Sequence, residues 1–406
     1  MRGISGFIRQ SGWWVGVSSV YAKILAFGMM LFLVWVLSES EFGRLTIALN
    51  FVGFFIPMVG FGASHGMLRF GARSDGEALQ DLRHYALRQG MGYQAVLSVV
   101  VIASALVFYW GQWAVLGLVF LMLFRLFGLF LLEQAKAEVR AELDNKKYAR
   151  IEIVSNSVAL VSGVLLTIFY GAWGYVVSLC LYPFSVLFLH RFRSSWVSLE
   201  QGFRKAFWDF SIKSVLTYIV FMWVFLLDVF FVGRYFSAEA VGWYKISTLI
   251  PMNLIFLAQV YTQTLYPELC RRADQKTYLR HFIKTYYFIF VPVTGVLLVS
   301  GYWFSRELMA LFGEGCQDVS VLKIMFWQMA SCILMRIPMG NLLSAMGHIT
   351  ASLFIGVVIL LLMLLGYLFF LPGEKPLVAA LISLICITLG GVMAVIFFVY
   401  KFSKLG

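Results

Sequence analysis

Seven of the charged or amide side chains within the long apolar runs of this sequence are candidates for function. They are the bases Lys23, Arg125, Lys245 and Arg336, the acid Asp228 and the amides Asn50 and Asn253. If such runs cross a membrane, a charge at mid-depth costs roughly 2.5–3.5 kcal/mol and usually faces a cavity with a function. A guanidinium can hold a phosphate by two parallel hydrogen bonds, and an ammonium adds a point charge. The residue types therefore predict a cationic cavity that binds an anion.

The four bases differ in depth, and this leaves different roles open. Lys23 and Arg125 lie near the middle of their runs, so we expect them to line the cavity. A structural ion pair or a hydrogen bond to a broken helix is the alternative for both. Lys245 lies near an outer interface, where snorkelling is the alternative. Arg336 stands beside Pro338 near the end of a run and could instead anchor the inner interface.

Asp228 is the only clear acid deep in a run. It could titrate in a coupling cycle, or it could form an ion pair with Lys245 across a short turn. Asn50 and Asn253 could bind sugar hydroxyls. They could equally form interhelical hydrogen bonds, which are worth about 0.6 kcal/mol each.

The elements that must position these residues are membrane spans. The chain is 61% hydrophobic and 13% charged, whereas soluble domains have about 45–50% apolar and about 25% charged residues. A span needs about 20 apolar residues, and lipid requires helices because backbone groups must pair within the segment. Twelve runs qualify: 13–37, 45–66, 91–110, 114–134, 151–170, 173–190, 213–235, 242–265, 284–304, 318–338, 350–371 and 377–400. The sequence thus predicts an all-α polytopic membrane protein with twelve transmembrane helices.

The basic residues fix the expected orientation. With the N-terminus in the cytoplasm, 23 of the 32 Lys and Arg fall in cytoplasmic segments, so both termini are expected there. This bias explains most of the +12 net charge, and nucleic acid need not be a partner. Residues 1–14 lack a signal-peptide cleavage site and are expected to lie at the interface through Ile4, Phe7 and Ile8.

A short phrase occurs once in each half of the chain. "SESEFG" at 38–43 and "SAEAVG" at 237–242 are 199 residues apart, each after the first span of its half. Six spans on either side give both halves the same orientation, and parallel repeats of this kind occur in transporters. We therefore expect two six-helix bundles, residues 1–200 and 201–406, around a central cavity.

Motifs for catalysis are missing from the sequence. There is no GxxxxGK[ST], GxSxG or HExxH, and the five cysteines and five histidines have no metal-ligand spacing. The expected outer loops are short, "LPGEKP" among them. We expect neither an enzyme nor a cofactor or metal site.

The run "DVFFVGRYFSAEAVGWYKISTLI" resembles the seventh and eighth spans of polysaccharide flippases. In that family an Asp precedes small residues, a turn and Val-Gly-x-Tyr, which are matched here by Asp228, Gly233, Val241, Gly242 and Tyr244. "LSESEFGRLTIA", "LYPELCRRAD", "LFGEG" and "LLSAMGH" are similar to further stretches of the family. The chain is thus similar to the Wzx-type O-antigen branch of the multidrug/oligosaccharidyl-lipid/polysaccharide exporter superfamily.

The resemblance implies alternating access of two bundles in a V around the cavity. The implied substrate is an undecaprenyl-diphosphate-linked oligosaccharide of lipopolysaccharide or a related polymer, moved across the bacterial inner membrane. Membrane lipid, a polysaccharide polymerase and a chain-length regulator are the implied partners. Two alternatives stay open. A cation-coupled multidrug antiporter of the same superfamily would favour buried acids, and a membrane glycosyltransferase or polymerase would need larger outer loops or clustered acids.

Overall fold

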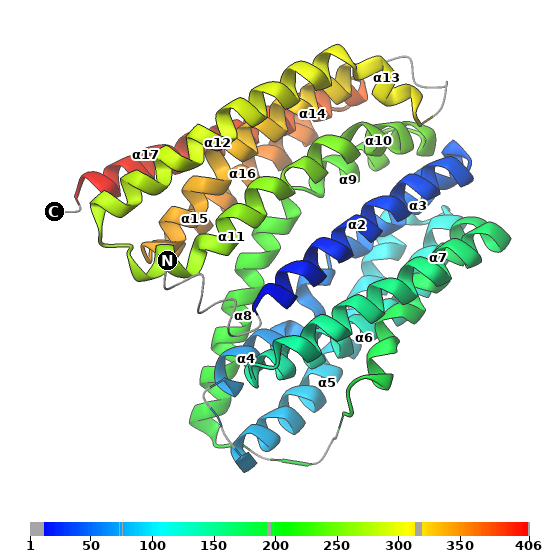
Figure 1. The fold of residues 1–406 in the computed structure, drawn as a ribbon. Coiled ribbons are helices and arrows are strands. Elements are labelled where there is room, and N and C mark those ends of the chain that lie inside the picture. The colour runs from blue at the N-terminus through cyan, green and yellow to red at the C-terminus, as the bar shows by residue number, and fades with distance from the viewer. Residues whose placement is uncertain are drawn as a thin grey trace. The chain divides into compact units, whose positions relative to one another are not determined.

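The computed structural model describes residues 12–72, 74, 76–192, 196–197, 199–312 and 319–404. Every regular element in these ranges is helical, which confirms the predicted all-α class (Figure 1). The chain divides into two compact units, Met1–Met222 and Trp223–Gly406, called unit 1 and unit 2 below. The division predicted from the sequence lies at residue 200, before the last helix of unit 1. Two six-helix bundles divided at that residue stay a prediction. The interfacial segment expected around Ile4, Phe7 and Ile8 lies outside the described residues.

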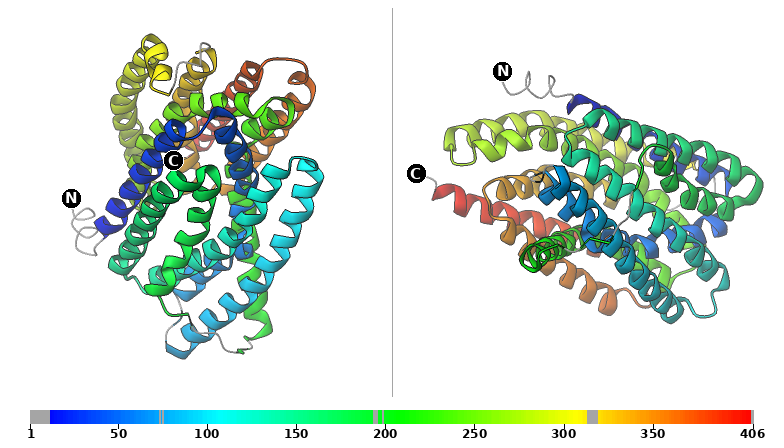
Figure 2. Two further views of the ribbon diagram at one scale, coloured as in Figure 1. Left: turned by 90° about the vertical axis from the view of Figure 1, so that its right-hand side faces the viewer. Right: turned by 90° about the horizontal axis from the view of Figure 1, so that it is seen from below.

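Unit 1 is built from long helices packed along their lengths (Figures 1 and 2). They are α2 (Gly12–Val36), α3 (Glu39–Gly53), α4 (Ala63–Gly71), α5 (Gly76–Tyr109), α6 (Trp113–Ala141), α7 (Asn145–Leu181) and α8 (Gln201–Trp223), with the 3₁₀ segments η1 (Ile56–Gly62) and η2 (Tyr182–Phe188). α6 packs against α3, α4, α5 and α7, and α7 also packs against α2. The helix that carries Arg125 therefore lies inside the unit.

α7 and η2 form a hairpin. Together they count 44 residues, and a straight helix of that length would be about 66 Å long, about twice the thickness of a bilayer core. Gly171 breaks α7 with φ 57° and ψ −140°, a conformation that favours glycine. The arms then run back along each other, because the hydroxyls of Ser162 and Ser178 lie 2.7 Å apart and those of Ser155 and Ser185 lie 2.9 Å apart. The two arms correspond to the fifth and sixth predicted spans.

The second predicted span is interrupted at η1. Gly60, Phe61 and Gly62 have positive φ there, and α4 begins after them. The break leaves the Gly60 N–H outside a regular helix, and the side-chain oxygen of the buried Gln94 accepts it at 3.1 Å. A Cβ on Gly60 would lie 2.3 Å from the ring of Phe130. Only glycine fits this close approach.

Unit 2 contains α9 (Leu227–Tyr235), α10 (Ala238–Leu254), α11 (Phe256–Arg271), α12 (Lys276–Trp303), α13 (Ser305–Ala310), α14 (Ser320–Ser331), α15 (Ile337–Ala345), α16 (Ile349–Phe370) and α17 (Pro376–Ser403). A single π-helical turn, η3 (Cys332–Arg336), joins α14 to α15. Such a turn leaves a carbonyl group without its usual helical partner. Tyr286 and Tyr287 of α12 donate to the carbonyls of Ile333 at 2.6 Å and Leu334 at 2.8 Å. α12 therefore stabilises the π turn.

The repeated phrase marks the same helix start in both units. Ser38 is the N-cap of α3 and accepts the Glu41 N–H at 3.3 Å. Ser237 is the N-cap of α10 and accepts the Ala240 N–H at 3.3 Å. The two donors are 199 residues apart, and so are the two acceptors. The two turns therefore match in register as well as in sequence.

Ten helices among the described residues are long and apolar enough to cross a membrane, or eleven if α8 and α9, which meet at a 55° bend, form one span. Counting the arms of α7 separately gives twelve, which is consistent with the sequence. Several helices extend beyond their apolar runs: α5 begins at Gly76, and α6 continues to Ala141. Lys, Arg and Glu are good helix formers, so a drop in hydropathy does not end a helix.

Candidate functional site

Arg125 lines a cavity inside unit 1. The cavity has a volume of about 180 Å³ and is bounded by α2, α6, both arms of α7 and the start of η2. Its polar lining consists of Arg125, Asn156, Tyr175 and Tyr182, and the rest of the lining is apolar. One guanidinium, two phenols and one amide thus converge on the same space within the spans.

The protein leaves this guanidinium incompletely hydrogen-bonded. Nε of Arg125 is buried and has no hydrogen-bond partner among the described residues. No carboxylate is among the residues that line the cavity. Leaving a buried donor unsatisfied costs about 1–3 kcal/mol, and more when it is charged. The arrangement can donate several hydrogen bonds to an anion, and the phenols and the amide can bind sugar hydroxyls.

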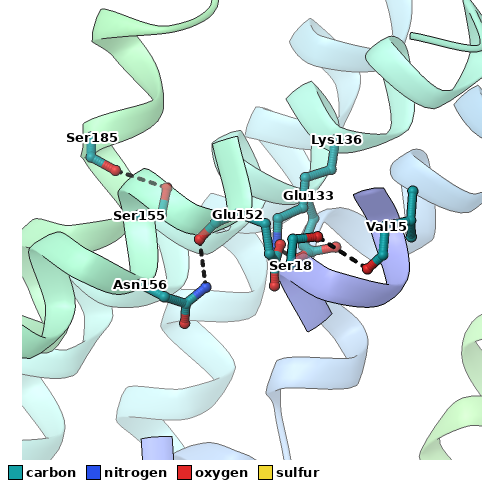
Figure 3. A network of polar contacts seen from close by, with 8 residues as sticks. All are labelled: Val15, Ser18, Glu133, Lys136, Glu152, Ser155, Asn156 and Ser185. Carbon is teal, nitrogen blue, oxygen red and sulfur yellow. Dashed lines mark hydrogen bonds and ion pairs between the residues drawn. The ribbon is translucent and has the colours of Figure 1, made fainter. Parts of the chain in front are cut away.

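An ion-pair network holds α6 against α7 beside the cavity (Figure 3). Nζ of Lys136 lies 2.7 Å from Glu152 on α7 and 3.2 Å from Glu133 on its own helix. The backbone carbonyl of Glu152 accepts the side-chain amide of Asn156 at 2.7 Å. Lys136 lies beyond the predicted span 114–134 but within α6, and 13% of its side chain is exposed. The network therefore fixes the turn that presents Asn156 to the cavity.

Asp228 is held at a helix start in unit 2. α8 ends at Trp223 and α9 begins at Leu227, so Asp228 lies in a first turn, where free N–H groups and the helix dipole favour negative charge. Its Oδ1 accepts the N–H of Val229 at 2.7 Å, and its Oδ2 accepts the hydroxyl of Tyr244 at 3.1 Å. Both carboxyl oxygens therefore accept hydrogen bonds from the protein.

Lys245 is not a direct partner of this carboxylate. Among the described residues, no ion pair within 4.0 Å joins Lys245 to Asp228, although Lys245 is near enough to act on it electrostatically. The groups in contact are the Tyr244 hydroxyl and a backbone amide. A role of Asp228 in coupling stays a prediction.

Arg336 lies well inside its span. It is the last residue of the π turn, sixteen residues after the start of the span Ser320–Ala345. Its Nη1 is buried with no hydrogen-bond partner in the part of the chain that the structure describes. The guanidinium carbon lies 5.8 Å from the ring centre of Phe225. An interfacial anchor would extend to headgroups, so this burial favours an interior role over an anchor.

The remaining candidates differ in exposure. Lys23 is exposed on α2, and Asn50 is buried on α3. Neither is among the residues that line the Arg125 cavity. Asn253 is exposed on α10, and its amide donates to the Leu249 carbonyl one turn back at 2.7 Å. Their binding roles stay predictions.

Sequence reasoning missed three residues of the cavity. Asn156 had a usable signal, because it is a polar residue inside a predicted span, as Asn50 is. Tyr175 and Tyr182 had none, because tyrosine is frequent in membrane helices and belts. Within the described ranges, no group of three or more His, Cys, Asp or Glu could hold a metal ion.

Comparisons with known proteins agree with this architecture. A family model described as "Polysaccharide biosynthesis protein" matches residues 32–311. A solved structure of the lipid II flippase MurJ, in an inward closed conformation, has a TM-score of 0.76 at 14% identity, with 96% of this chain and 89% of that chain covered. An inward-facing multidrug resistance MATE family transporter of the MOP superfamily has a TM-score of 0.71 at 14% identity, covering 95% and 94%. At these identities the likeness shows a shared fold. No curated protein matches the sequence significantly.

Proposed function

This chain belongs to the polysaccharide biosynthesis protein family, and from that membership we propose that it is a flippase for an undecaprenyl-diphosphate-linked oligosaccharide. The observation that supports this substrate class is the Arg125 cavity. It offers a buried, incompletely bonded guanidinium together with phenol and amide groups, and no carboxylate lines it. A diphosphate supplies the acceptors that this site lacks, and sugar hydroxyls suit its neutral polar groups.

The proposed cycle is alternating access in the bacterial inner membrane, with both termini in the cytoplasm. Arg125 would hold the diphosphate, Asn156 and the two tyrosines would contact the first sugars, and the polyprenyl tail would stay in lipid. The sequence has no ATP-binding loop, so we assign the drive to an ion gradient coupled through Asp228 or to use of the product outside. A polymerase and a chain-length regulator would consume that product as O-antigen or a related surface polymer.

The alternative, a cation antiporter, needs a carboxylate that a cation can reach. Asp228 is the acid within the spans that could serve, and its position in the first turn of α9 favours this alternative in part. Both of its oxygens, however, are already hydrogen-bonded by the protein. The two proposals therefore assign the substrate to different residues.

The test is complementation of a deletion strain. We expect the deletion to lose long-chain surface polysaccharide on a gel, and the wild-type gene and Arg44→Ala to restore it, because Arg44 is an exposed arginine of the same unit. Arg125→Ala should reach the membrane and fail to restore the polymer. Intact polysaccharide in the deletion strain, together with sensitivity to cationic dyes that Asp228→Asn fails to relieve, would replace the flippase by the antiporter.

A further inference from the structure

A second polar pocket lies in unit 1, at the charged ends of α5 and α6. Its volume is about 160 Å³. The lining residues are Gln80, Arg83, His84, Leu87, Glu138, His190, Arg191 and Phe192. None of them lines the Arg125 cavity. Glu138 is thirteen residues beyond Arg125 on α6, which corresponds to about 20 Å along the helix.

Basic side chains dominate this pocket. Gln80, Arg83 and His84 have i, i+3, i+4 spacing and so share one face of α5. His190 and Arg191 follow η2 and approach from a different segment of the chain. Against these four basic groups, the lining contains one carboxylate, Glu138.

Other side chains of the protein already bind the Glu138 carboxylate. Glu138 is 4% exposed, and its Oε1 accepts the side-chain amide of Gln134 at 3.0 Å. Its Oε2 lies 2.8 Å from Nε2 of His190 and 3.9 Å from Nε of Arg83. Arg83 in turn pairs with Glu142 at 2.5 Å. The acid is therefore an orienting group and is not available to a cation.

His190 is left with one unused ring nitrogen. An ionised carboxylate only accepts hydrogen bonds, so Nε2 carries a proton toward Glu138. Nδ1 is buried without a hydrogen-bond partner among the described residues, and the side chain is 8% exposed. When the ring is protonated, Nδ1–H also donates. Glu138 thus holds one ring nitrogen of His190 and leaves the other for a ligand.

We propose that this pocket binds a phosphate group, separately from the Arg125 cavity. Nδ1 of His190 and the Arg191 guanidinium supply the principal donors, with Arg83, His84 and Gln80 completing the site. Arginine with charge-assisted partners is suited to the oxygens of a phosphate. The phosphate can belong to a membrane lipid headgroup or to a soluble diphosphate, and the two sources are separable by experiment.

The experiment measures thermal unfolding of the full chain in nanodiscs at constant ionic strength. One arm adds pyrophosphate to protein in phosphatidylcholine discs, and the other replaces part of the phosphatidylcholine by phosphatidylglycerol. A ligand that binds only the folded state raises Tm. Arg191→Gln removes an exposed charge without leaving a buried partner, and His190→Gln removes the buried donor. Arg204→Gln, an exposed arginine of unit 1 outside the pocket, is the matched control.

We expect a rise in Tm with wild type, with Arg204→Gln and with Arg125→Ala, and at least about tenfold weaker binding in Arg191→Gln and His190→Gln, since a charge-assisted bond is worth about 1.5–3 kcal/mol. A response confined to pyrophosphate assigns a soluble diphosphate, and one confined to phosphatidylglycerol assigns a lipid headgroup. No response in either arm, or an equal response in Arg191→Gln and wild type, would overturn the proposal. The proposed function assigns a diphosphate to the Arg125 cavity as well, so a response that Arg125→Ala retains belongs to this pocket and does not depend on that function.

Discussion

The contact between Tyr244 and Asp228 can be tested by a double-mutant cycle. The perturbations are Tyr244→Phe and Asp228→Leu, alone and combined. Phe keeps the ring of Tyr244, which is 1% exposed, so the single change removes a hydroxyl without opening a cavity. Leu keeps approximately the size of the aspartate side chain and removes both its charge and its acceptor oxygens. The cycle therefore isolates the 3.1 Å hydrogen bond between the two side chains.

The expected coupling energy depends on the charge of Asp228. Both carboxylate oxygens accept hydrogen bonds, and the residue lies in the first turn of α9. The donated bonds and the helix start stabilise the ionised form, whereas burial at 6% exposure favours the neutral form. A hydrogen bond to a charged group is worth about 1.5–3 kcal/mol, against about 0.5–1.5 kcal/mol for a neutral pair. For an ionised Asp228 we therefore predict a coupling of at least about 1.5 kcal/mol.

The assay is reversible unfolding in mixed micelles, with denaturant midpoints converted to free energies. Tyr302→Phe is the control, because Tyr302 is 58% exposed and its change should cost less than about 0.5 kcal/mol. A coupling near 1 kcal/mol would show that Asp228 is neutral in the fold. It would then contradict the idea that the start of α9 keeps this carboxylate charged. A coupling indistinguishable from zero would refute the contact itself.

Three further predictions follow from the backbone and the cavity. Gly60→Ala should lower the free energy of unfolding by about 2–5 kcal/mol, because the strain of the left-handed backbone and the clash with Phe130 add. Gly76 also has a positive φ but has open space around it, so Gly76→Ala should cost only about 1–2 kcal/mol. Equal losses in the two variants would contradict the clash. Ser237→Ala should cost about 1 kcal/mol through the lost N-cap, and no change in Tm would show that water replaces the cap. Arg125→Lys should lower flux of a diphosphate-linked lipid in proteoliposomes about tenfold or more, and flux at the wild-type rate would show that two-point binding is not used.

The sequence predicted the membrane fold because lipid imposes a simple rule on it. Runs of about 20 apolar residues had to be helices, and the break between the runs 151–170 and 173–190 coincides with the turn at Gly171. The repeated phrase predicted equivalent turns, and Ser38 and Ser237 form equivalent N-caps. These features are local, so they can be read from a single stretch of chain.

The breaks inside spans could not be predicted in the same way. Residues 222–226, "MWVFL", contain neither Pro nor Gly, yet α8 and α9 meet there at 55°. The sequence therefore carries no strong helix-breaking signal at this bend. The partner of Asp228 was missed for a related reason. Charge suggested Lys245, but successive residues on a helix point about 100° apart, and it is Tyr244 that faces the carboxylate.

The buried acid and the buried bases differ in how well the protein satisfies them. Asp228 receives a backbone amide and a phenol, so its charge is compensated within unit 2. Arg125 and Arg336 each keep a buried guanidinium nitrogen without a hydrogen-bond partner among the described residues. Because an unsatisfied buried donor is costly, we expect water or a bound acceptor at both positions. A compensated Asp228 beside incompletely bonded arginines agrees with the anionic substrate proposed above, and an anion that binds to wild type and not to Arg125→Ala would confirm this interpretation.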